Sequence, residues 1–383
     1  MSRRLTVVQA LPALQAGGVE RSTLEIAAAL VAAGHRAVVV SAGGRLLADL
    51  QVAGGEHVAL EIGRKSPLVL RHVSSLRRLL VEVDADIVHA RSRLPAWIVR
   101  LALRGLPAAR RPRFVTTVHG LNSPSRYSAV MASGERVICV SDTVRAHVLR
   151  HYPETDPERL RVIPRGIDPA AFPMAPRPDR AARAGFAARY PQLAGDGPLL
   201  LLPGRGTRLK GHADALRLLT RLRAEGWDAR LWMPGAREPG REDYVAELES
   251  DAARAGIAHA VALTPPIADI AQAYAAADLT LQLSRKPEAF GRTVIEALSV
   301  GCPVVGWAHG GVGELLRELL PAGAIPAFDG HALHIEAQRM LAQAQALPDT
   351  MPARLSRYAL AAMQSATLNC YREIADDSSR DRR

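Results

Sequence analysis

Short apolar runs alternate with longer amphipathic stretches along this chain, in two series separated by a stretch rich in proline and glycine. The first series has strand-like runs at Thr6–Leu11, Ala37–Ser41, Ile87–Ala90, Phe114–Val118 and Arg136–Val140, with helical stretches at Val19–Ala33, Leu68–Val83, Leu94–Arg104 and Thr143–His151. The second has strand-like runs at Leu199–Leu202, Ala229–Met233, Val261–Thr264, Leu279–Leu283 and Val304–Gly306, with helical stretches at His212–Glu225, Tyr244–Ala255, Ile267–Ala276, Arg292–Val300, His331–Ala346 and Pro352–Ile374. This alternation predicts parallel sheets covered by helices on both faces.

The 383 residues are more than one hydrophobic core usually serves, so we expect two doubly wound, Rossmann-like α/β domains. The interdomain linker is predicted at about 164–197, where Pro and Gly cluster. The predicted domains are 1–168 and 169–354, and the charged tail 376–383 is predicted to be disordered. Because ligands bind beyond the carboxyl ends of parallel strands, the site is expected in a cleft between the two domains.

Composition excludes several classes of protein. Hydrophobic residues make up 48% and charged residues 23%, which argues against a disordered or fibrous chain. Aromatic residues make up only 4%, which argues against a stacking platform for single-stranded nucleic acid. No apolar run is long enough for a membrane span, and the N-terminus lacks the features of a secretory signal. The three cysteines have neither disulfide nor zinc spacing, so we expect a cytoplasmic protein.

Positive charge is concentrated in the first half of the chain. Up to Asp168 there are 24 Lys and Arg against 14 Asp and Glu, which is +10 of the net +11. A basic N-terminal half can bind an anionic substrate, a nucleic acid or an anionic membrane surface. A generally arginine-rich composition would also produce this excess of positive charge. The basic residues that we expect to face an anionic bilayer are Arg64, Lys65, Arg71, Arg77, Arg78, Arg110, Arg111 and Arg113.

The first glycine-rich motif is Gly17-Gly18-Val19-Glu20, between the first strand and the first helix. Glycines allow a ligand to approach the backbone, and a helix start offers N–H groups to an anion. Taken alone, the motif equally fits an ordinary strand-to-helix turn.

The second motif, residues 203–211, follows the strand-like run Leu199–Leu202. It places Gly204, Arg205 and Lys210, one of only three lysines, where a strand becomes a helix. Arginine and lysine there suit a phosphate group. The sequence matches neither a Walker A loop nor a dinucleotide fingerprint. The alternative is a solvated basic turn.

The third motif has two carboxylates, Glu288 and Glu296, on either side of Phe290-Gly291-Arg292-Thr293, where a helix begins. The amides of a helix start bind phosphate, and carboxylates accept hydrogen bonds from vicinal hydroxyls. We therefore expect a pocket for a sugar and a ribose beside a phosphate, rather than a solvated helix face. A further loop, Gly310-Gly311-Val312-Gly313-Glu314, ends in a carboxylate at another expected helix start.

Together these residues resemble the retaining glycosyltransferases of family 4, also called glycosyltransferase group 1, which have the GT-B architecture. The resemblance extends over nearly the whole chain, and its most specific element is Glu288-x7-Glu296. Its other elements are Gly17-Gly18-Val19-Glu20, His119-Gly120, Ser141-Asp142, the stretch 162–168, Gly204-Arg205, Lys210-Gly211 and Gly310-Gly311-x-x-Glu314.

The resemblance implies a role for each matching residue. Arg205 and Lys210 would hold the donor diphosphate, Glu288 the donor sugar and Glu296 the ribose. Gly17, Gly18 and Gly204 would line the donor site, together with Phe290, Gly291, Arg292 and Thr293. His119 would lie near the transferred sugar, although a lone histidine after a strand is more often structural. A C-terminal helix, at about 355–375, would pack on the N-terminal domain.

Two positions depart from the family pattern. Arg165 stands where Asn is usual, so linker contacts are expected to differ. Ala289 follows the first glutamate where Gly is usual, which narrows the backbone conformations available beside the donor sugar.

The function implied is transfer of a hexose from a nucleotide diphosphosugar, with retention of configuration, to a lipopolysaccharide core or another cell-surface glycan or glycolipid. A UDP-sugar is the expected donor, with a GDP-sugar as the alternative. No cofactor and no metal are expected, because the cations of the second motif can stabilise the leaving diphosphate. The enzyme is expected at the cytoplasmic face of the membrane, and no nucleic acid partner is expected. The alternatives are a nucleotide-sugar epimerase of similar architecture and a basic nucleotide-binding protein without transferase activity.

Overall fold

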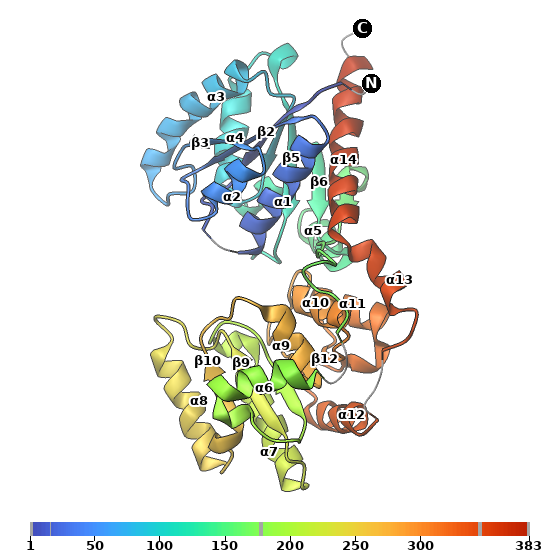
Figure 1. The fold of residues 1–383 in the computed structure, drawn as a ribbon. Helices are drawn as coiled ribbons and strands as arrows, with labels where there is room; N and C mark the ends of the chain where they lie inside the picture. Colours follow the sequence, from blue (N-terminus) through green and yellow to red (C-terminus); the bar gives the residue numbers. More distant parts are fainter. Residues whose placement is uncertain (1–2, 16, 176–178, 344–346, 381–383) are drawn as a thin grey trace. The chain divides into compact units, whose positions relative to one another are not determined.

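The computed structural model describes residues 3–15, 17–175, 179–343 and 347–380. Within these residues the chain divides into two compact units (Figure 1). Unit 1 holds the residues up to Gly166 together with the C-terminal segment from Leu360, and unit 2 is Ile167–Ala359. The division therefore falls two residues before the boundary predicted at Asp168.

Unit 1 is a parallel sheet with helices on both faces. Its elements are β1 (Thr6–Ala10), α1 (Gly18–Ala32), β2 (Arg36–Ser41), α2 (Leu47–Val52), β3 (Glu56–Ala59), α3 (His72–Glu82), β4 (Ile87–Ala90), α4 (Arg93–Arg104), β5 (Arg113–Val118), β6 (Arg136–Cys139), α5 (Asp142–His151), β7 (Leu160–Val162) and α14 (Leu360–Arg380). The strand order is β3-β2-β1-β4-β5-β6-β7. In register, Val8 of β1 is aligned with Val38 of β2 and Val88 of β4.

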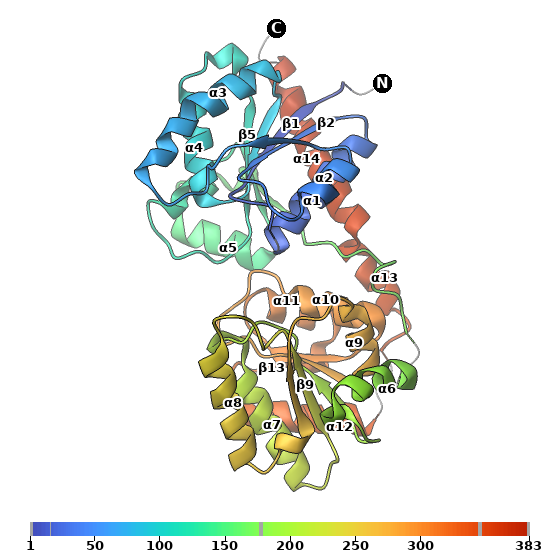
Figure 2. The same cartoon turned by 60° about the vertical axis from the view of Figure 1, so that its left-hand side comes forward.

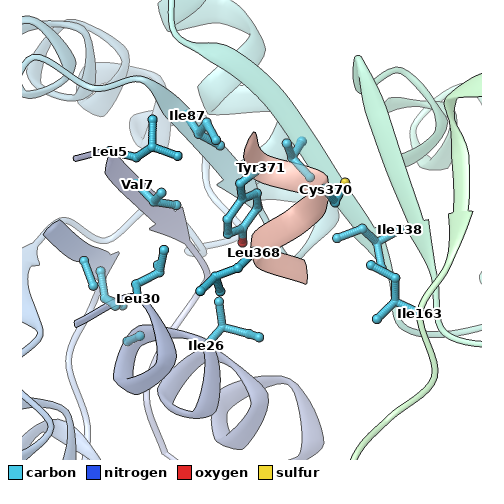
Figure 3. Packing of buried hydrophobic residues seen from close by; sticks show 14 of the residues in the cluster. Leu5, Val7, Ile26, Leu30, Ile87, Ile138, Ile163, Leu368, Cys370 and Tyr371 are labelled. Carbon is cyan, nitrogen blue, oxygen red and sulfur yellow. The ribbon is translucent and has the colours of Figure 1, made fainter. Parts of the chain in front are cut away.

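The core of unit 1 joins the two ends of the sequence. Helix α14 packs beside α1, as the two ribbon views show (Figures 1 and 2). Figure 3 shows Tyr371 and Leu368 of α14 directed toward Val7 of β1 and Ile26 of α1. All four side chains are buried, and burial of such a side chain contributes about 1.5–3 kcal/mol. The C-terminal helix is thus part of the core of unit 1.

Unit 2 repeats the same plan. Its elements are α6 (Arg180–Arg189), β8 (Leu199–Leu201), α7 (His212–Ala224), β9 (Arg230–Pro234), α8 (Glu242–Arg254), β10 (Val261–Thr264), α9 (Ile270–Ala276), β11 (Leu279–Gln282), α10 (Arg292–Val300), β12 (Val304–Trp307), α11 (Gly310–Leu319), β13 (Ala324–Ile325), α12 (Gly330–Ala342) and α13 (Met351–Leu355). The strand order is β10-β9-β8-β11-β12-β13, and all the pairings are parallel. The predicted pair of doubly wound, Rossmann-like units is confirmed.

The predicted linker was wrong in part, because it contains helix α6. Asp179 caps this helix by accepting a hydrogen bond from the Ala182 N–H. Phe186 of α6 is buried, and its ring centroid lies 4.4 Å from that of Trp232 on β9. One apolar anchor and a side-chain cap therefore hold a helix within a segment whose prolines and glycines predicted none.

The C-terminal segment also differs from the prediction. The continuous helix predicted over Pro352–Ile374 is interrupted, since α13 gives way to a 3-10 turn, Ser356–Tyr358, and then to an extended Ala359. Helix α14 continues to Arg380, so the backbone of 376–380 is helical where disorder was predicted. Residues 381–383 of the predicted tail lie outside the described residues, as do 344–346 at the end of the helix predicted over His331–Ala346.

Candidate functional site

The predicted phosphate loop runs from β8 to α7 and lies close to both neighbouring strands. The N–H of Gly204, which has a φ of 149°, donates to the carbonyl of Pro234, the last residue of β9, over 2.9 Å. A Cβ on Gly206 would lie 2.1 Å from the Ala236 carbonyl oxygen, and one on Gly211 would lie 2.1 Å from that of Leu283. Glycine at these positions is therefore required for the loop to fit between β9 and β11.

The two cations of this loop differ in their surroundings. The Arg205 residue is exposed, and its side chain has no hydrogen bond or ion pair with any residue that the structure describes, although its carbonyl accepts from the Thr207 N–H over 2.7 Å. The Lys210 ammonium instead donates to Glu288 Oε1 over 2.6 Å, and the two side chains are 30% and 26% exposed. The sequence-predicted phosphate ligand and sugar ligand are thus brought together, at the carboxyl ends of β8 and β11.

Glu288 has further donors that sequence reasoning missed. Ser284 Oγ donates to its Oε1 over 2.5 Å, and Gln282 Nε2 donates to its Oε2 over 3.4 Å. Burial acts to raise the pKa of Glu288, but the Lys210 ammonium, the Ser284 hydroxyl and the Gln282 amide together hold that pKa below its usual value. The carboxylate is therefore ionised at neutral pH and can accept hydrogen bonds from sugar hydroxyls.

The loop that carries Glu288 is fixed from the other side by the start of α11. The Gly311 N–H donates to the Glu288 carbonyl over 2.8 Å, and a hydrogen bond of 2.8 Å joins His309 Nε2 to the Ser284 carbonyl. A Cβ on Gly310 would lie 2.6 Å from the Glu288 carbonyl oxygen, and its φ is 59°. The Gly310-Gly311 pair therefore packs against the glutamate loop.

Ala289 does not strain this loop. It is absent from the described non-glycine residues with positive φ, so its backbone has a conformation that alanine adopts freely. The departure from the family's glycine at this position therefore costs no backbone strain.

Helix α10 begins immediately after the loop. Gly291 caps it with a φ of 112°, and a Cβ there would lie 2.8 Å from Val312 Cγ2. Arg292 and Thr293 form its first turn, where backbone amides precede the helical hydrogen-bonding pattern. The start of α10 therefore has the form of an anion site. The Phe290 side chain is buried, with its ring centroid 6.1 Å from that of Tyr358, so it packs in the interior of unit 2.

Glu296 lies one turn further along α10. The Tyr274 hydroxyl donates to its Oε2 over 3.1 Å, and Arg292 Nε lies 3.4 Å from its Oε1. Its side chain is only 13% exposed, so it is not the solvated helix residue of the alternative interpretation. Burial, followed by the Glu296 charge, raises the pKa of Tyr274 well above its usual value, which keeps that hydroxyl a donor.

In unit 1, Gly17 caps α1 and Gly18 begins it; both are exposed. A Cβ on Gly18 would meet no atom within 4 Å, so packing within unit 1 does not require glycine there. A Cβ on Gly17 would lie 2.6 Å from Glu20 Oε2, which is the end of a flexible side chain.

His119 directly follows β5, and the Arg165 guanidinium contacts its Nδ1. Burial, then Arg165, Arg91 and His89, hold the pKa of His119 well below its usual value. Its Nε2 is buried and has no hydrogen-bond partner among the described residues.

Beside His119 lies a buried polar network that sequence reasoning missed. Arg91 is 4% exposed and donates to Gln9 Oε1 over 2.8 Å. His89 shares one hydrogen bond of 2.6 Å with the Tyr371 hydroxyl and another of 2.6 Å with Thr117 Oγ1. The sequence signal that could have revealed this network is a polar residue near the end of each of the strands β1, β4 and β5.

Two other findings bear on the site. In the described part of the chain, no group of three or more His, Cys, Asp and Glu side chains is arranged to hold a metal. A hollow of about 780 Å³ in unit 2 is lined by Arg183, Asp196 and Asp278. Asp278 immediately precedes β11, so this hollow lies at the amino ends of the strands, away from Lys210 and Glu288.

The family models that match this chain cover its two halves separately. A family model described as Glycosyltransferase Family 4 matches residues 16–171, and one described as Glycosyl transferases group 1 matches 188–359. The structure of a glycosyltransferase from Rickettsia africae superposes with a TM-score of 0.86 at 27% identity, covering 97% of this chain and 99% of that one. HepE from Anabaena, in complex with UDP and glucose, superposes with a TM-score of 0.77 at 19% identity, covering 96% and 99%.

Curated relatives match a smaller part. The D-inositol 3-phosphate glycosyltransferase of Xylanimonas cellulosilytica is 33% identical over 46% of this chain and 43% of its own length. The enzyme of that name from Acidothermus cellulolyticus is 30% identical over 63% of this chain and 57% of its own. The match thus spans about half the length of these relatives.

The fold of the two units is that of the GT-B glycosyltransferases. The chain belongs to the group 1 glycosyltransferases, with a family 4 domain as its N-terminal half.

Proposed function

We propose that the protein transfers a hexose from a nucleotide diphosphosugar, with UDP as the first candidate for the nucleotide, to a hydroxyl group of a phosphorylated acceptor, with retention of configuration. The observation that carries the proposal is the Lys210–Glu288 pair at the carboxyl ends of β8 and β11. The Lys210 ammonium lies 2.6 Å from the ionised Glu288 carboxylate, next to the start of α10, which supports a phosphate-binding role for the lysine and a sugar-binding role for the carboxylate.

Each charged group then has a task in the transfer. Lys210, Arg205 and the first amides of α10 stabilise the negative charge that develops on the diphosphate as the bond between it and the anomeric carbon breaks. Glu288 orients the sugar through its hydroxyls, and Glu296 accepts hydrogen bonds from the ribose. The acceptor oxygen forms the new bond to the anomeric carbon, on the face that the diphosphate leaves, and its proton passes to the leaving phosphate. No protein nucleophile and no metal take part.

The donor and acceptor are argued from similar proteins. HepE of Anabaena was solved with UDP-glucose, which favours a UDP-sugar here. Solved structures of similar fold include a lipopolysaccharide outer core galactosyltransferase, WaaB, and WaaG, described as involved in lipopolysaccharide biosynthesis. The curated relatives are named for D-inositol 3-phosphate, a phosphorylated acceptor. We propose a phosphorylated lipopolysaccharide core as the acceptor, with an inositol phosphate as the second candidate, because unit 1 carries most of the positive charge.

We further propose that unit 1 binds the cytoplasmic face of the membrane reversibly. Leu68 and Leu70 are 62% and 55% exposed on a 3-10 turn, between Arg64-Lys65 and Arg71. Each basic residue near an anionic surface contributes about 1 kcal/mol. None of the helices within the described residues is long and apolar enough to cross a bilayer.

Several of the eight basic residues named from the sequence have contacts within unit 1. The exposed Arg111 donates to the Leu106 carbonyl over 3.0 Å, and the exposed Arg64 lies 3.5 Å from Glu61. Arg77 donates to the Ala102 carbonyl over 3.2 Å, which joins α3 to α4, and Arg113 forms an ion pair of 2.6 Å with Glu135. A membrane-binding variant should therefore spare Arg77 and Arg113.

Membrane binding is tested by cosedimentation with vesicles containing phosphatidylglycerol, at low and at physiological salt. Replacing Arg64, Lys65, Arg71 and Arg78 together by Gln should reduce binding and leave UDP binding unchanged. Binding should fall as salt rises, since charges separated by more than about 8 Å are screened at physiological ionic strength. Equal binding to neutral and anionic vesicles would contradict the electrostatic account.

The catalytic proposal is tested in two stages. Thermal shifts with UDP, GDP and ADP identify the nucleotide, because a ligand that binds only the folded state raises its stability. Transfer is then assayed with the matching sugar nucleotide and either a phosphorylated lipopolysaccharide core or D-inositol 3-phosphate, with and without EDTA. Arg205→Ala and Lys210→Ala should each weaken nucleotide binding and transfer about tenfold or more. Arg208→Ala is the matched control, because that arginine lies in the same loop but pairs with Glu247.

The same assays separate the alternatives. A nucleotide-sugar epimerase would convert the donor without any acceptor, and a nucleotide-binding protein would show the thermal shift without turnover. Normal nucleotide affinity and transfer in both alanine variants would overturn the assignment of the phosphate site.

A further inference from the structure

The residue that departs from the family pattern before the second unit, Arg165, contacts His119 directly. It follows β7 by three positions, and its guanidinium Nη2 meets His119 Nδ1. These two residues are 46 positions apart in the sequence and both belong to unit 1. The contact is therefore internal to one compact unit.

This contact decides where the proton of His119 lies. A guanidinium has only donors, so His119 Nδ1 must accept with its lone pair. An imidazole whose Nδ1 accepts is neutral and carries its single proton on Nε2. The Nε2 atom is buried and unpaired within the described residues. Because a buried donor without a partner is costly, this N–H is available to a hydrogen-bond acceptor from outside unit 1.

The surroundings of His119 oppose a second proton. Burial lowers the pKa of His119, and the charges of Arg165, Arg91 and His89 lower it further. Arg165 follows β7, and the other two lie at the end of β4. No acidic group in the described part of unit 1 is among those that act on His119. His89 uses both of its nitrogens on Tyr371 of α14 and Thr117 of β5, so it does not compete for His119.

We propose that Arg165 is a positioning residue that holds His119 as the neutral tautomer protonated on Nε2, so that this N–H donates to a hydroxyl oxygen of the transferred sugar. The tautomer follows from unit 1 alone, whereas the use of the N–H rests on the proposed function. An asparagine at position 165 could not dictate the tautomer, because its amide can donate or accept.

The first experiment is long-range ¹⁵N–¹H correlation NMR on the histidine-labelled full chain without ligand, with the His119 signals assigned by their loss in His119→Gln. The wild type should show the Nε2–H tautomer, and its His119 should become protonated only at a pH well below the usual pKa of histidine. Arg165→Met, which has no donor, should admit the Nδ1–H tautomer and titrate at higher pH, because one cation is gone. Arg165→Lys, again a pure donor, should restore the wild-type pattern.

The control is Arg161→Met, which removes a positive charge on β7 from a side chain that donates to the Glu158 carbonyl. It should leave the His119 signals unchanged. A His119 pKa at or above the usual value, or an Nδ1–H tautomer, in the wild type would overturn the proposal. So would an Arg165→Met spectrum identical to that of the wild type.

The second experiment measures turnover of UDP-glucose and the affinity for UDP. Arg165→Met should lower kcat about tenfold, the effect of one lost hydrogen bond in the transition state, and keep the Kd for UDP within twofold. Arg165→Lys should recover most of kcat, and Arg161→Met should stay within twofold of the wild type. Unchanged kcat in Arg165→Met with an altered tautomer would refute the positioning role. Absence of UDP binding and turnover in the wild type would instead refute the proposed donor, while the spectra still decide the tautomer.

Discussion

Replacing Glu288 by Gln should strengthen the binding of free UDP while it weakens sugar transfer. The Lys210 ammonium donates to Glu288 Oε1 over 2.6 Å, so a diphosphate must draw the lysine away from a carboxylate. The neutral amide of Gln releases Lys210 and removes a negative charge beside the phosphates. The same change removes the ionised acceptor that we assign to the sugar hydroxyls, so turnover should fall by about tenfold or more.

The magnitude follows from the geometry of the pair. A hydrogen bond to a charged group contributes about 1.5–3 kcal/mol. Since 30% of the Lys210 side chain and 26% of the Glu288 side chain are exposed, solvent reduces this to about 1 kcal/mol. That corresponds to about fivefold tighter UDP binding. It also corresponds to a melting temperature about 2–4 °C lower for a unit of this size.

The assay is isothermal titration with UDP, together with thermal unfolding of each variant. Glu249→Gln is the matched control, because it breaks the ion pair with Arg237 elsewhere in unit 2 and leaves Lys210 untouched. The reasoning would be refuted if Glu288→Gln bound UDP more than fivefold more weakly than the wild type while it melted at the same temperature as Glu249→Gln. It would mean that the carboxylate supports the nucleotide rather than restraining Lys210.

Three further outcomes are expected. Burial lowers the pKa of His212 to about 4, so unfolding takes up a proton below pH 6.5. The free energy of unfolding of the wild type should therefore fall by about 3 kcal/mol between pH 6.5 and 4. Unfolding measured at each pH should show a smaller loss for His212→Asn. Tyr371→Phe removes the hydroxyl that pairs with His89 and should destabilise unit 1 by about 1–3 kcal/mol in a denaturant titration. Gly310→Ala should lower transfer, because its Cβ would lie 2.6 Å from a carbonyl oxygen of the glutamate loop, whereas Gly240→Ala, with similarly positive φ and open space, should not.

The architecture could be predicted from the sequence because buried parallel strands are short apolar runs. Strands β1, β4, β5 and β8 lie within two residues of their predicted ends. Strand β3 escaped prediction because it is an edge strand with exposed and half-buried residues, Glu56-His57-Val58-Ala59, and so has no apolar run. Helix α6 escaped because prolines and glycines surround its own helix-favouring Ala and Arg residues, and because its only buried side chain is Phe186.

At the candidate site, spacing predicted the carboxylates but not their partners. Glu288 and Glu296 flank a helix start, which a local pattern can reveal. The contact of Lys210 with Glu288 joins residues 78 positions apart, and that of Arg165 with His119 joins residues 46 apart. Such contacts depend on which strands are neighbours in the sheet, so one sequence without its fold predicts that Arg165 is unusual but not what it touches. The assigned roles of these residues remain predictions.

The return of α14 to unit 1 also sets an order of events during synthesis. Unit 1 emerges first from the ribosome, but Met363, Leu368 and Tyr371 of its core lie beyond Ile167–Ala359, the whole of unit 2. At about 5–20 residues per second, the nascent first unit waits roughly 10–40 s with α1 and the sheet uncovered on that face. Unit 2, which is one continuous segment, has no such delay and can complete its core while the chain is still attached. A stop codon just before Leu360 would therefore leave the last-made unit intact and the first-made unit without its final layer, a reversal of the usual consequence of late truncation.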